Sequence, residues 1–170
     1  IAVSGRRKMA DDEVAKVDEY LKDKITKMTE TRELYSMGKS SQQVGAKSRL
    51  TFIKAIKGKY PLIGAIKLSS GKVIDENFIE KLQENPYVLI SREVEHQLKV
   101  KIGDALWFGD QKFEVFDTIE SDSTSSLRGV SLAPKVYIGD AFLDKTNLIK
   151  FGTLAWYSRY YLLKDDSKLD

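Results

Sequence analysis

The side chains that could take part in catalysis are few in this sequence and lie far apart. His96 is the one histidine and cysteine is absent, which excludes a zinc cluster of imidazole and thiolate ligands. A Ser-His-Asp triad would have to use His96, and no serine elbow accompanies it. The Gly-x-x-x-x-Gly-Lys-Ser/Thr phosphate loop is also missing. We expect His96 to be an ordinary surface residue.

The acidic residues do not indicate a reactive pair either. Glu120 and Asp122 lie in a serine-rich segment, where two carboxylates could hold a cation weakly, although solvated loop charges are far more common. No spacing among the 25 acids points to a glycosidase-like carboxylate pair. We therefore predict that the chain is not an enzyme and has no metal ion and no cofactor.

A short apolar loop is the first candidate contact site. Pro61 and Gly64 break the pattern of the preceding strand, so that Tyr60, Leu62 and Ile63 would stand in a loop beside it. We predict that these three side chains are exposed and contact a substrate or a partner. The alternative is that they fill a gap between two lobes of the chain.

A basic tract is the second candidate site. The net charge is +3, and no aspartate or glutamate occurs between Leu34 and Ile74. Such a tract can face anionic lipid headgroups or nucleic acid, whereas lysines spread over a solvated sheet face would only block pairing at its edge. The candidate basic face consists of Lys47, Arg49, Lys54, Lys57 and Lys59.

The hydrophobic pattern predicts a mixture of helices and strands that would position these sites. Apolar residues spaced by three and four predict a helix over residues 11–28, and Asp75 is a suitable N-cap for a helix that ends before Pro86. In residues 49–57, Leu50 and Phe52 alternate with polar neighbours, which is typical of a strand. Further strands are predicted at 1–4, 33–38, 66–68, 87–90, 106–108, 113–115, 135–138 and 154–163, further helices at 91–98 and 139–147, and loops at 39–47 and 117–129.

The pattern contains neither a membrane span nor a signal peptide. No run of 18 or more apolar residues occurs, and the amino-terminal residues lack the charged, apolar and small-residue regions of a leader. The chain begins without methionine at an apolar strand, which we interpret as a piece of a longer protein.

Four stretches, in their order along the chain, resemble the extracytoplasmic domain of MacB/FtsX-type ABC transporter permeases, nearest to the YbbP-like branch. They are residues 4–7 before an acidic helix start, residues 60–64 after an alternating strand, residues 88–116, and residues 132–138 together with 146–149 and the tyrosine-rich last strand. Together the four stretches cover most of the chain. Their shared order carries the resemblance more strongly than any one stretch alone.

The resemblance implies an α+β fold with a MacB-like periplasmic core. A porter-like αβ lobe would comprise about residues 1–38, 75–98 and 135–164, and a smaller inserted β-rich lobe about residues 48–70 and 100–130. The domain would lie on the extracytoplasmic side of the bacterial inner membrane, in the periplasm, anchored by flanking transmembrane helices outside this chain.

The same resemblance implies a non-catalytic role in transport. ATP hydrolysis by a separate cytoplasmic ATPase subunit would move the domain through the membrane helices. A second permease copy or a paralogue would be a partner, an envelope lipid, lipoprotein or peptide would be the substrate, and no nucleic acid is expected.

A second interpretation does not depend on the resemblance. The chain could be a soluble binding module that contains a β-barrel and uses the basic tract on nucleic acid. Such binding would weaken steeply as salt is added.

Overall fold

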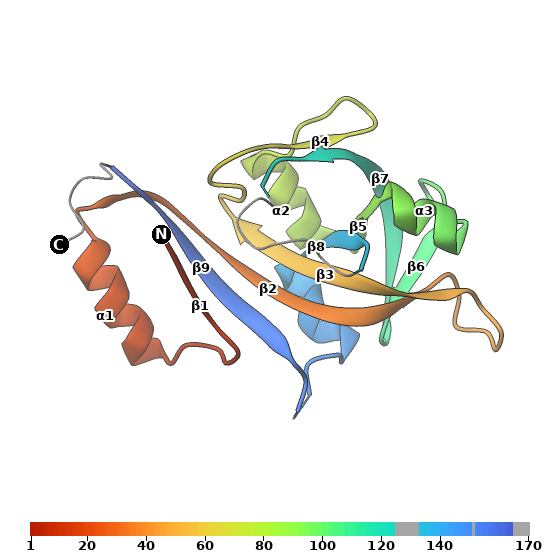
Figure 1. Cartoon of the computed structure of the whole chain (residues 1–170), viewed down its shortest axis with the longest axis horizontal. Helices are drawn as coiled ribbons and strands as arrows, with labels where there is room; N and C mark the ends of the chain where they lie inside the picture. The colour runs from red at the N-terminus through yellow and green to blue at the C-terminus, as the bar shows by residue number, and fades with distance from the viewer. Residues whose placement is uncertain (125–132, 151, 165–170) are drawn as a thin grey trace.

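The computed structural model describes residues 1–124, 133–150 and 152–164. They form one mixed β-sheet with helices packed against it (Figure 1). The strands are β1 (Ala2–Gly5), β2 (Ile25–Lys39), β3 (Ser48–Gly58), β4 (Ile66–Leu68), β5 (Tyr87–Ser91), β6 (Ala105–Phe108), β7 (Gln111–Asp122), β8 (Lys135–Gly139) and β9 (Ala155–Leu163). The helices are α1 (Asp11–Leu21), α2 (Glu76–Glu84), α3 (Arg92–Leu98) and α4 (Asp140–Leu143), which continues into a 3-10 turn (Asp144–Thr146). The predicted α+β class is confirmed.

Six strands close into a small barrel. Around it, β2 pairs with β3, β3 with β8, β8 with β5, β5 with β7, and β7 with β6. The ring closes where Gly38 of β2 lies opposite Phe108 of β6. A Cβ atom at position 38 would stand 2.9 Å from Cε1 of Phe108, so glycine allows this close approach.

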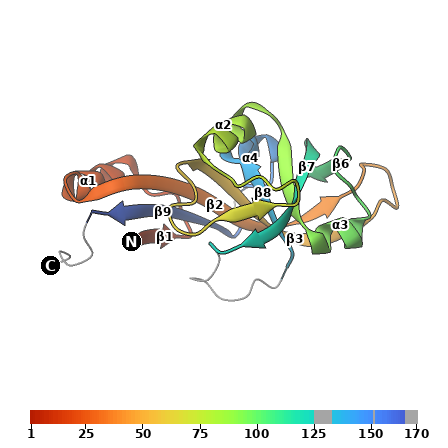
Figure 2. The ribbon, with the colours of Figure 1, turned by 90° about the horizontal axis from the view of Figure 1, so that it is seen from above.

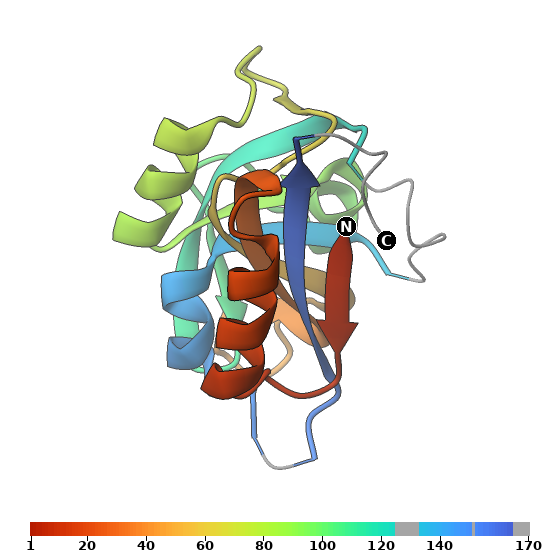
Figure 3. The same cartoon turned by 90° about the vertical axis from the view of Figure 1, so that its left-hand side faces the viewer.

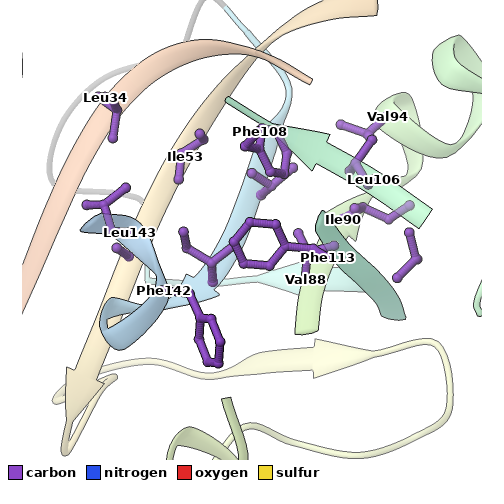
Figure 4. Packing of buried hydrophobic residues seen from close by; sticks show 14 of the residues in the cluster. Leu34, Ile53, Val88, Ile90, Val94, Leu106, Phe108, Phe113, Phe142 and Leu143 are labelled. Carbon is purple, nitrogen blue, oxygen red and sulfur yellow. The ribbon is translucent and has the colours of Figure 1, made fainter. Parts of the chain in front are cut away.

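The barrel interior is the main hydrophobic core. Alternate residues of the strands point inward and are joined by Val94 from α3 and by Phe142 and Leu143 from α4, which approach from opposite sides in Figure 4. Because the interior is filled by branched aliphatic and aromatic side chains at close packing, it is a core and not a channel. The strand residues in it include Leu34, Ile53, Val88, Ile90, Leu106, Phe108, Phe113, Val115, Val136 and Ile138.

A second apolar cluster covers the outside of the barrel. Helix α2 starts at Asp75, whose carboxylate accepts the Phe78 N–H at 2.8 Å, as the capping pattern predicted. Its buried residues Phe78, Ile79 and Leu82 pack with β4 and with residues of β3, β5 and β8. The helix lies close to β8, since a Cβ atom on Gly139 would stand only 2.0 Å from the Leu82 carbonyl oxygen.

The first half of β2, β9 and β1 form an extension beyond the barrel (Figure 2). Helix α1 packs on one face of this extension, as Figure 3 shows. The amino group of Ile1 donates a hydrogen bond to the Tyr161 carbonyl at 2.8 Å. The amino terminus and the end of β9 therefore lie together, at the opposite end of the molecule from the β2–β3 hairpin (Figures 1 and 2).

Two predicted elements are wrong in their extent. The helix expected over residues 11–28 ends at Leu21, and Ile25 already begins β2. Pairing of this part of β2 with β9 outweighs the helical spacing of Ile25 and Met28. The loop expected over residues 117–129 is strand β7 as far as Asp122, since Asp117 and Thr118 pair with β5; residues 125–129 lie outside the described part.

The other predicted strands and helices are present, with small differences at their ends. No helix in the described ranges is long and apolar enough to cross a membrane. The division of the chain into a porter-like lobe and a β-rich lobe stays a prediction.

Candidate functional site

The predicted contact loop is only partly exposed. Ile63 exposes 70% of its surface and Leu62 is half-buried, but Tyr60 exposes only 5%. The expected exposure of Tyr60 is therefore wrong, because its ring packs in the apolar cluster under α2. Its hydroxyl is 3.1 Å from the Thr124 hydroxyl oxygen, which holds this part of the loop on the barrel.

A buried ion pair lies beneath Tyr60. Glu33 of β2 and Lys54 of β3 are cross-strand neighbours, and Lys54 Nζ is 3.0 Å from Glu33 Oε1, with both side chains largely removed from solvent. The same Nζ lies 5.0 Å from the Tyr60 ring centroid. Burial alone would lower the pKa of Lys54, but Tyr60 and the Glu33 carboxylate outweigh it and raise that pKa. Lys54 is therefore a fixed cation and no proton donor near neutral pH.

A second ion pair, which is partly buried, adjoins the first. Asp122 accepts hydrogen bonds from Lys135 Nζ at 2.8 Å, from the Tyr137 hydroxyl at 2.7 Å and from the Thr124 hydroxyl at 2.5 Å. Burial opposes ionisation, yet these donors, first Lys135, lower the pKa of Asp122 to about 2. Burial, with Tyr60 and Asp122 nearby, raises the pKa of Tyr137.

These side chains form what we call the buried ionic cluster: Glu33, Lys54, Tyr60, Asp122, Lys135 and Tyr137. Each of its charges faces a charge of opposite sign. A group that is ionised and saturated with hydrogen bonds is a poor general base. The cluster therefore fixes the loop on the barrel, and it does not resemble a reactive centre.

The cations of the predicted basic face do not gather on one surface. Lys54 and Lys57 are three residues apart in β3 and so point to opposite faces. Lys57 pairs with Glu30 at 2.5 Å and lies 3.9 Å from Asp140. Lys47 and Arg49 lie at the hairpin end of the barrel, and Lys59 is exposed just after β3. This arrangement does not favour nucleic-acid binding, and a binding role for these residues stays a prediction.

Lys57 belongs to a continuous chain of charges that joins α1 to α4 across one face of the sheet. Arg159 of β9 holds both Asp18 of α1, at 3.0 Å, and Glu30 of β2. Arg32 binds Asp140 and Asp144 at 2.6 Å each. In this chain of charges, neighbouring side chains follow one another in space in the order Asp18, Arg159, Glu30, Lys57, Asp140, Arg32, Asp144.

The outer face of the β2–β3 hairpin is an exposed apolar surface that sequence reasoning missed. Tyr35 packs on Phe52 with ring centroids 5.0 Å apart and lies 6.1 Å from the Trp156 ring. Met37 pairs with Leu50 next to them. The alternation of Leu50 and Phe52 with their neighbours was the sequence signal for an apolar strand face. The structure places Thr51 and Ile53 in the barrel interior, so the face that carries Leu50 and Phe52 is the outer one.

The residues first considered for catalysis are not assembled. His96 and Glu120 are exposed, and Asp122 belongs to the buried ionic cluster. Trp156 and Tyr160 of β9 point to one face of the sheet, and Tyr157 and Tyr161 point to the other. In the ranges that the structure describes, no three acidic or histidine side chains are grouped to hold a metal ion.

Comparison with known sequences gives no match, either to a family model or to a curated protein. Solved structures that are similar over most of the chain include those of two extracytoplasmic regions. The extracellular domain of the noncanonic ABC-type transporter YknZ from Gram-positive bacteria has a TM-score of 0.60 and 12% identity, over 93% of this chain and 74% of that one. The periplasmic region of MacB from Actinobacillus actinomycetemcomitans has a TM-score of 0.56 and 14% identity, over 98% and 76%. The chain thus has the MacB-like periplasmic fold that the resemblance implied.

Proposed function

We propose that this chain is the non-catalytic extracytoplasmic domain of a MacB/FtsX-type ABC transporter permease. The observation that carries the proposal is the shared fold over 93% of the chain with the extracellular domain of YknZ. At 12% identity, two chains retain such a likeness through the pattern of buried positions and turns rather than through particular surface residues. The YbbP-like branch is part of the proposal.

The position of the two ends supports an insertion between membrane helices. Strands β1 and β9 are antiparallel, with Ala2 opposite Tyr160, so the chain enters and leaves the domain at the same end. A domain held between two transmembrane helices needs this arrangement, because both helices start from one membrane surface.

The proposed role is to pass movement from the membrane to the cell envelope. A separate cytoplasmic ATPase subunit hydrolyses ATP, and the flanking helices move the domain. The permease acts with a second copy or a paralogue and handles a lipid, lipoprotein or peptide on the periplasmic side of the inner membrane. The filled barrel and the charge chain across β9, β2 and β3 suit a domain that moves as a body.

The loop that carries Ile63 remains a proposed contact site. With Tyr60 buried, the contact would rest on Ile63 and on the exposed part of Leu62. In the complete transporter, Leu62→Asp and Ile63→Asp should reduce transport or partner binding. Unchanged transport and binding in both variants would remove this site from the proposal.

The sequence of the parent gene on both sides of this segment tests the proposal. An apolar run of about 20 residues just before the segment, and several such runs after it, are expected. Soluble flanks, or a start codon at the boundary, would contradict it.

A further inference from the structure

A shallow apolar groove lies between helix α1 and β1, which is the strand at one edge of the described sheet. The residues that line the groove are Ile1, Val3, Lys16, Val17, Tyr20 and Leu21. Its volume is about 310 Å³, at the lower end of the roughly 300–1,000 Å³ of pockets that enclose small molecules. Because the groove is open on one side, it can cover one face of an occupant but cannot enclose it.

The walls of the groove are almost wholly apolar. Tyr20 exposes 55% of its surface and Ile1 exposes 46%, so two large side chains of the groove remain open to solvent. A peptide backbone or a sugar laid against these walls would lose hydrogen bonds to water without finding new partners, which costs free energy. A hydrocarbon chain has no such bonds to lose and gains by leaving water. The walls therefore favour a hydrocarbon occupant.

Two lysines stand at the rim of the groove. The Lys24 ammonium lies over the Tyr20 ring, with Nζ 4.0 Å from the ring centroid. Lys16 lines the groove, while its exposed ammonium is 3.8 Å from an Asp12 carboxylate oxygen. Lysines that lay their methylene groups on apolar surface and keep their ammonium groups in water, next to a tyrosine, are typical of membrane interfaces. An anionic phospholipid would offer the acyl chain that the walls favour and a headgroup that attracts the lysines.

The groove lies where β1 begins and β9 ends. The Tyr161 N–H donates to the Ile1 carbonyl and the Lys164 N–H donates to the Lys24 carbonyl, each at 2.8 Å. Figures 1 and 3 show α1 and β1 together at this end of the molecule. The inference rests on the proposed function, because a domain inserted between two membrane helices has this end next to the bilayer. We propose that the groove between α1 and β1 binds anionic phospholipid at the membrane surface.

Flotation of the chain with phosphatidylcholine vesicles, with and without phosphatidylglycerol, tests this inference. The wild type should bind the vesicles that contain phosphatidylglycerol more tightly than those without it. The variant Lys16→Glu/Lys24→Glu should weaken this binding by about tenfold or more, because an anionic surface attracts each lysine near it. The charge-matched variant Lys67→Glu/Lys72→Glu, on and beside β4, should change the binding by less than about twofold, since it lies far from the groove.

A pair of exposed tyrosines provides a matched control for the apolar part of the site. Tyr20→Ser should weaken vesicle binding by about fivefold. Tyr35→Ser, on β2 and away from the groove, should leave it unchanged. Cooperative thermal unfolding of each variant verifies that the fold is retained. Equal losses in test and control variants, or no binding of the wild type to vesicles, would overturn the inference.

Two neighbouring residues of β1 report whether lipid occupies the groove. Val3 lines the groove, and Ala2 points to the opposite face of the sheet. Because the chain contains no cysteine, a bimane label can be attached to Val3→Cys or to Ala2→Cys alone. Doxyl-labelled phosphatidylcholine in the vesicles should quench the label on Val3→Cys and leave the label on Ala2→Cys largely unquenched. Equal quenching at the two positions would overturn the inference.

A protein segment is the alternative occupant, since an extended peptide could add to the edge of β1. A fluorescein-labelled peptide of alternating valine and threonine probes this alternative. Peptide binding that is tighter than vesicle binding, and that Tyr20→Ser weakens, would likewise overturn the inference. Because the gene flanks test the membrane insertion independently, failure of vesicle binding would leave the proposed function standing.

Discussion

Ala2 of β1 lies directly opposite Tyr160 of β9 in antiparallel register. This pairing brings the first and last described strands together at the edge of the sheet, while the β2–β3 hairpin projects from the other end of the molecule (Figure 1). The paired strands β1 and β9 and the β2–β3 hairpin thus lie at opposite ends of the described structure.

Asp122 is expected to be the most sensitive residue of the buried ionic cluster. Asp122→Asn leaves the Lys135 ammonium without its carboxylate, 2.8 Å away in the wild type, and should lower the free energy of unfolding by about 2–3 kcal/mol. Urea unfolding measures the loss. Asp23→Asn, at an exposed site, is the matched control, and similar values for the two variants would contradict the structural role of Asp122.

Asp122 should also make stability depend on pH in the acid range. Its pKa falls from 3.8 to about 2 on folding. Because the pKa of Asp122 is lower in the folded protein, its ionised carboxylate stabilises the fold. This stabilisation is complete at a pH above the pKa of the unfolded state, and it is lost as the pH falls through the pKa of the folded state. The contribution is about 2 kcal/mol. The difference in unfolding free energy between wild type and Asp122→Asn should therefore shrink between about pH 4 and pH 2, and a constant difference would argue against this account.

Arg159 is expected to fasten α1 to the sheet. Its guanidinium lies 3.0 Å from Asp18 on α1 and also holds Glu30 of β2. Arg159→Gln should speed amide hydrogen exchange in α1 while leaving the barrel strands protected. The double-mutant cycle with Asp18→Asn should give a coupling of about 1 kcal/mol, since Asp18 is partly exposed.

The exposed pair of Arg7 and Glu13 provides the control for that cycle. Arg7→Gln should change exchange in α1 much less. If Arg7→Gln and Arg159→Gln had equal effects, the ionic link from α1 to the sheet would not be specific.

Gly139 should tolerate no side chain, because of the closeness of α2. A Cβ atom there would stand 2.0 Å from the Leu82 carbonyl oxygen, a backbone atom. Gly139→Ala should therefore destabilise the domain by about 3 kcal/mol, as α2 is pushed off the barrel. Gly5→Ala, where the nearest atom would be at 3.7 Å, should have little effect. Thermal unfolding of the two variants measures this difference in stability. A Gly139→Ala variant as stable as the wild type would show that α2 moves easily.

The sequence predicted those elements whose signals are local. Asp75 and Pro86 bound α2 because a cap and a proline act on adjacent residues. The long strand β2 was mistaken for a helix at its start, since its partners β3 and β9 are distant in sequence and Ile25 and Met28 happen to have helical spacing. Closure of the barrel at Gly38 and Phe108 depends on a contact that no local pattern encodes.

The candidate site was predictable only in part, for the same reason. Tyr60 and Lys54 were singled out separately, and the structure brings them together with Asp122 and Tyr137, which sequence reasoning had no means to combine. The sequence identified the basic residues of the tract, but not the face of the sheet to which each side chain points. Lys54 and Lys57 diverge because the side chains of a strand alternate, and their carboxylate partners come from β2.

The most direct test of the central claim is to locate this domain relative to the membrane. The chain contains no cysteine, so Val44→Cys places a single reactive thiol at a fully exposed position. In intact cells that express the complete protein, with any cysteine outside this segment replaced by serine, a membrane-impermeant maleimide should label Val44→Cys but not the protein without this substitution. Labelling that appears only after the inner membrane is broken would place the domain in the cytoplasm and contradict an extracytoplasmic permease domain.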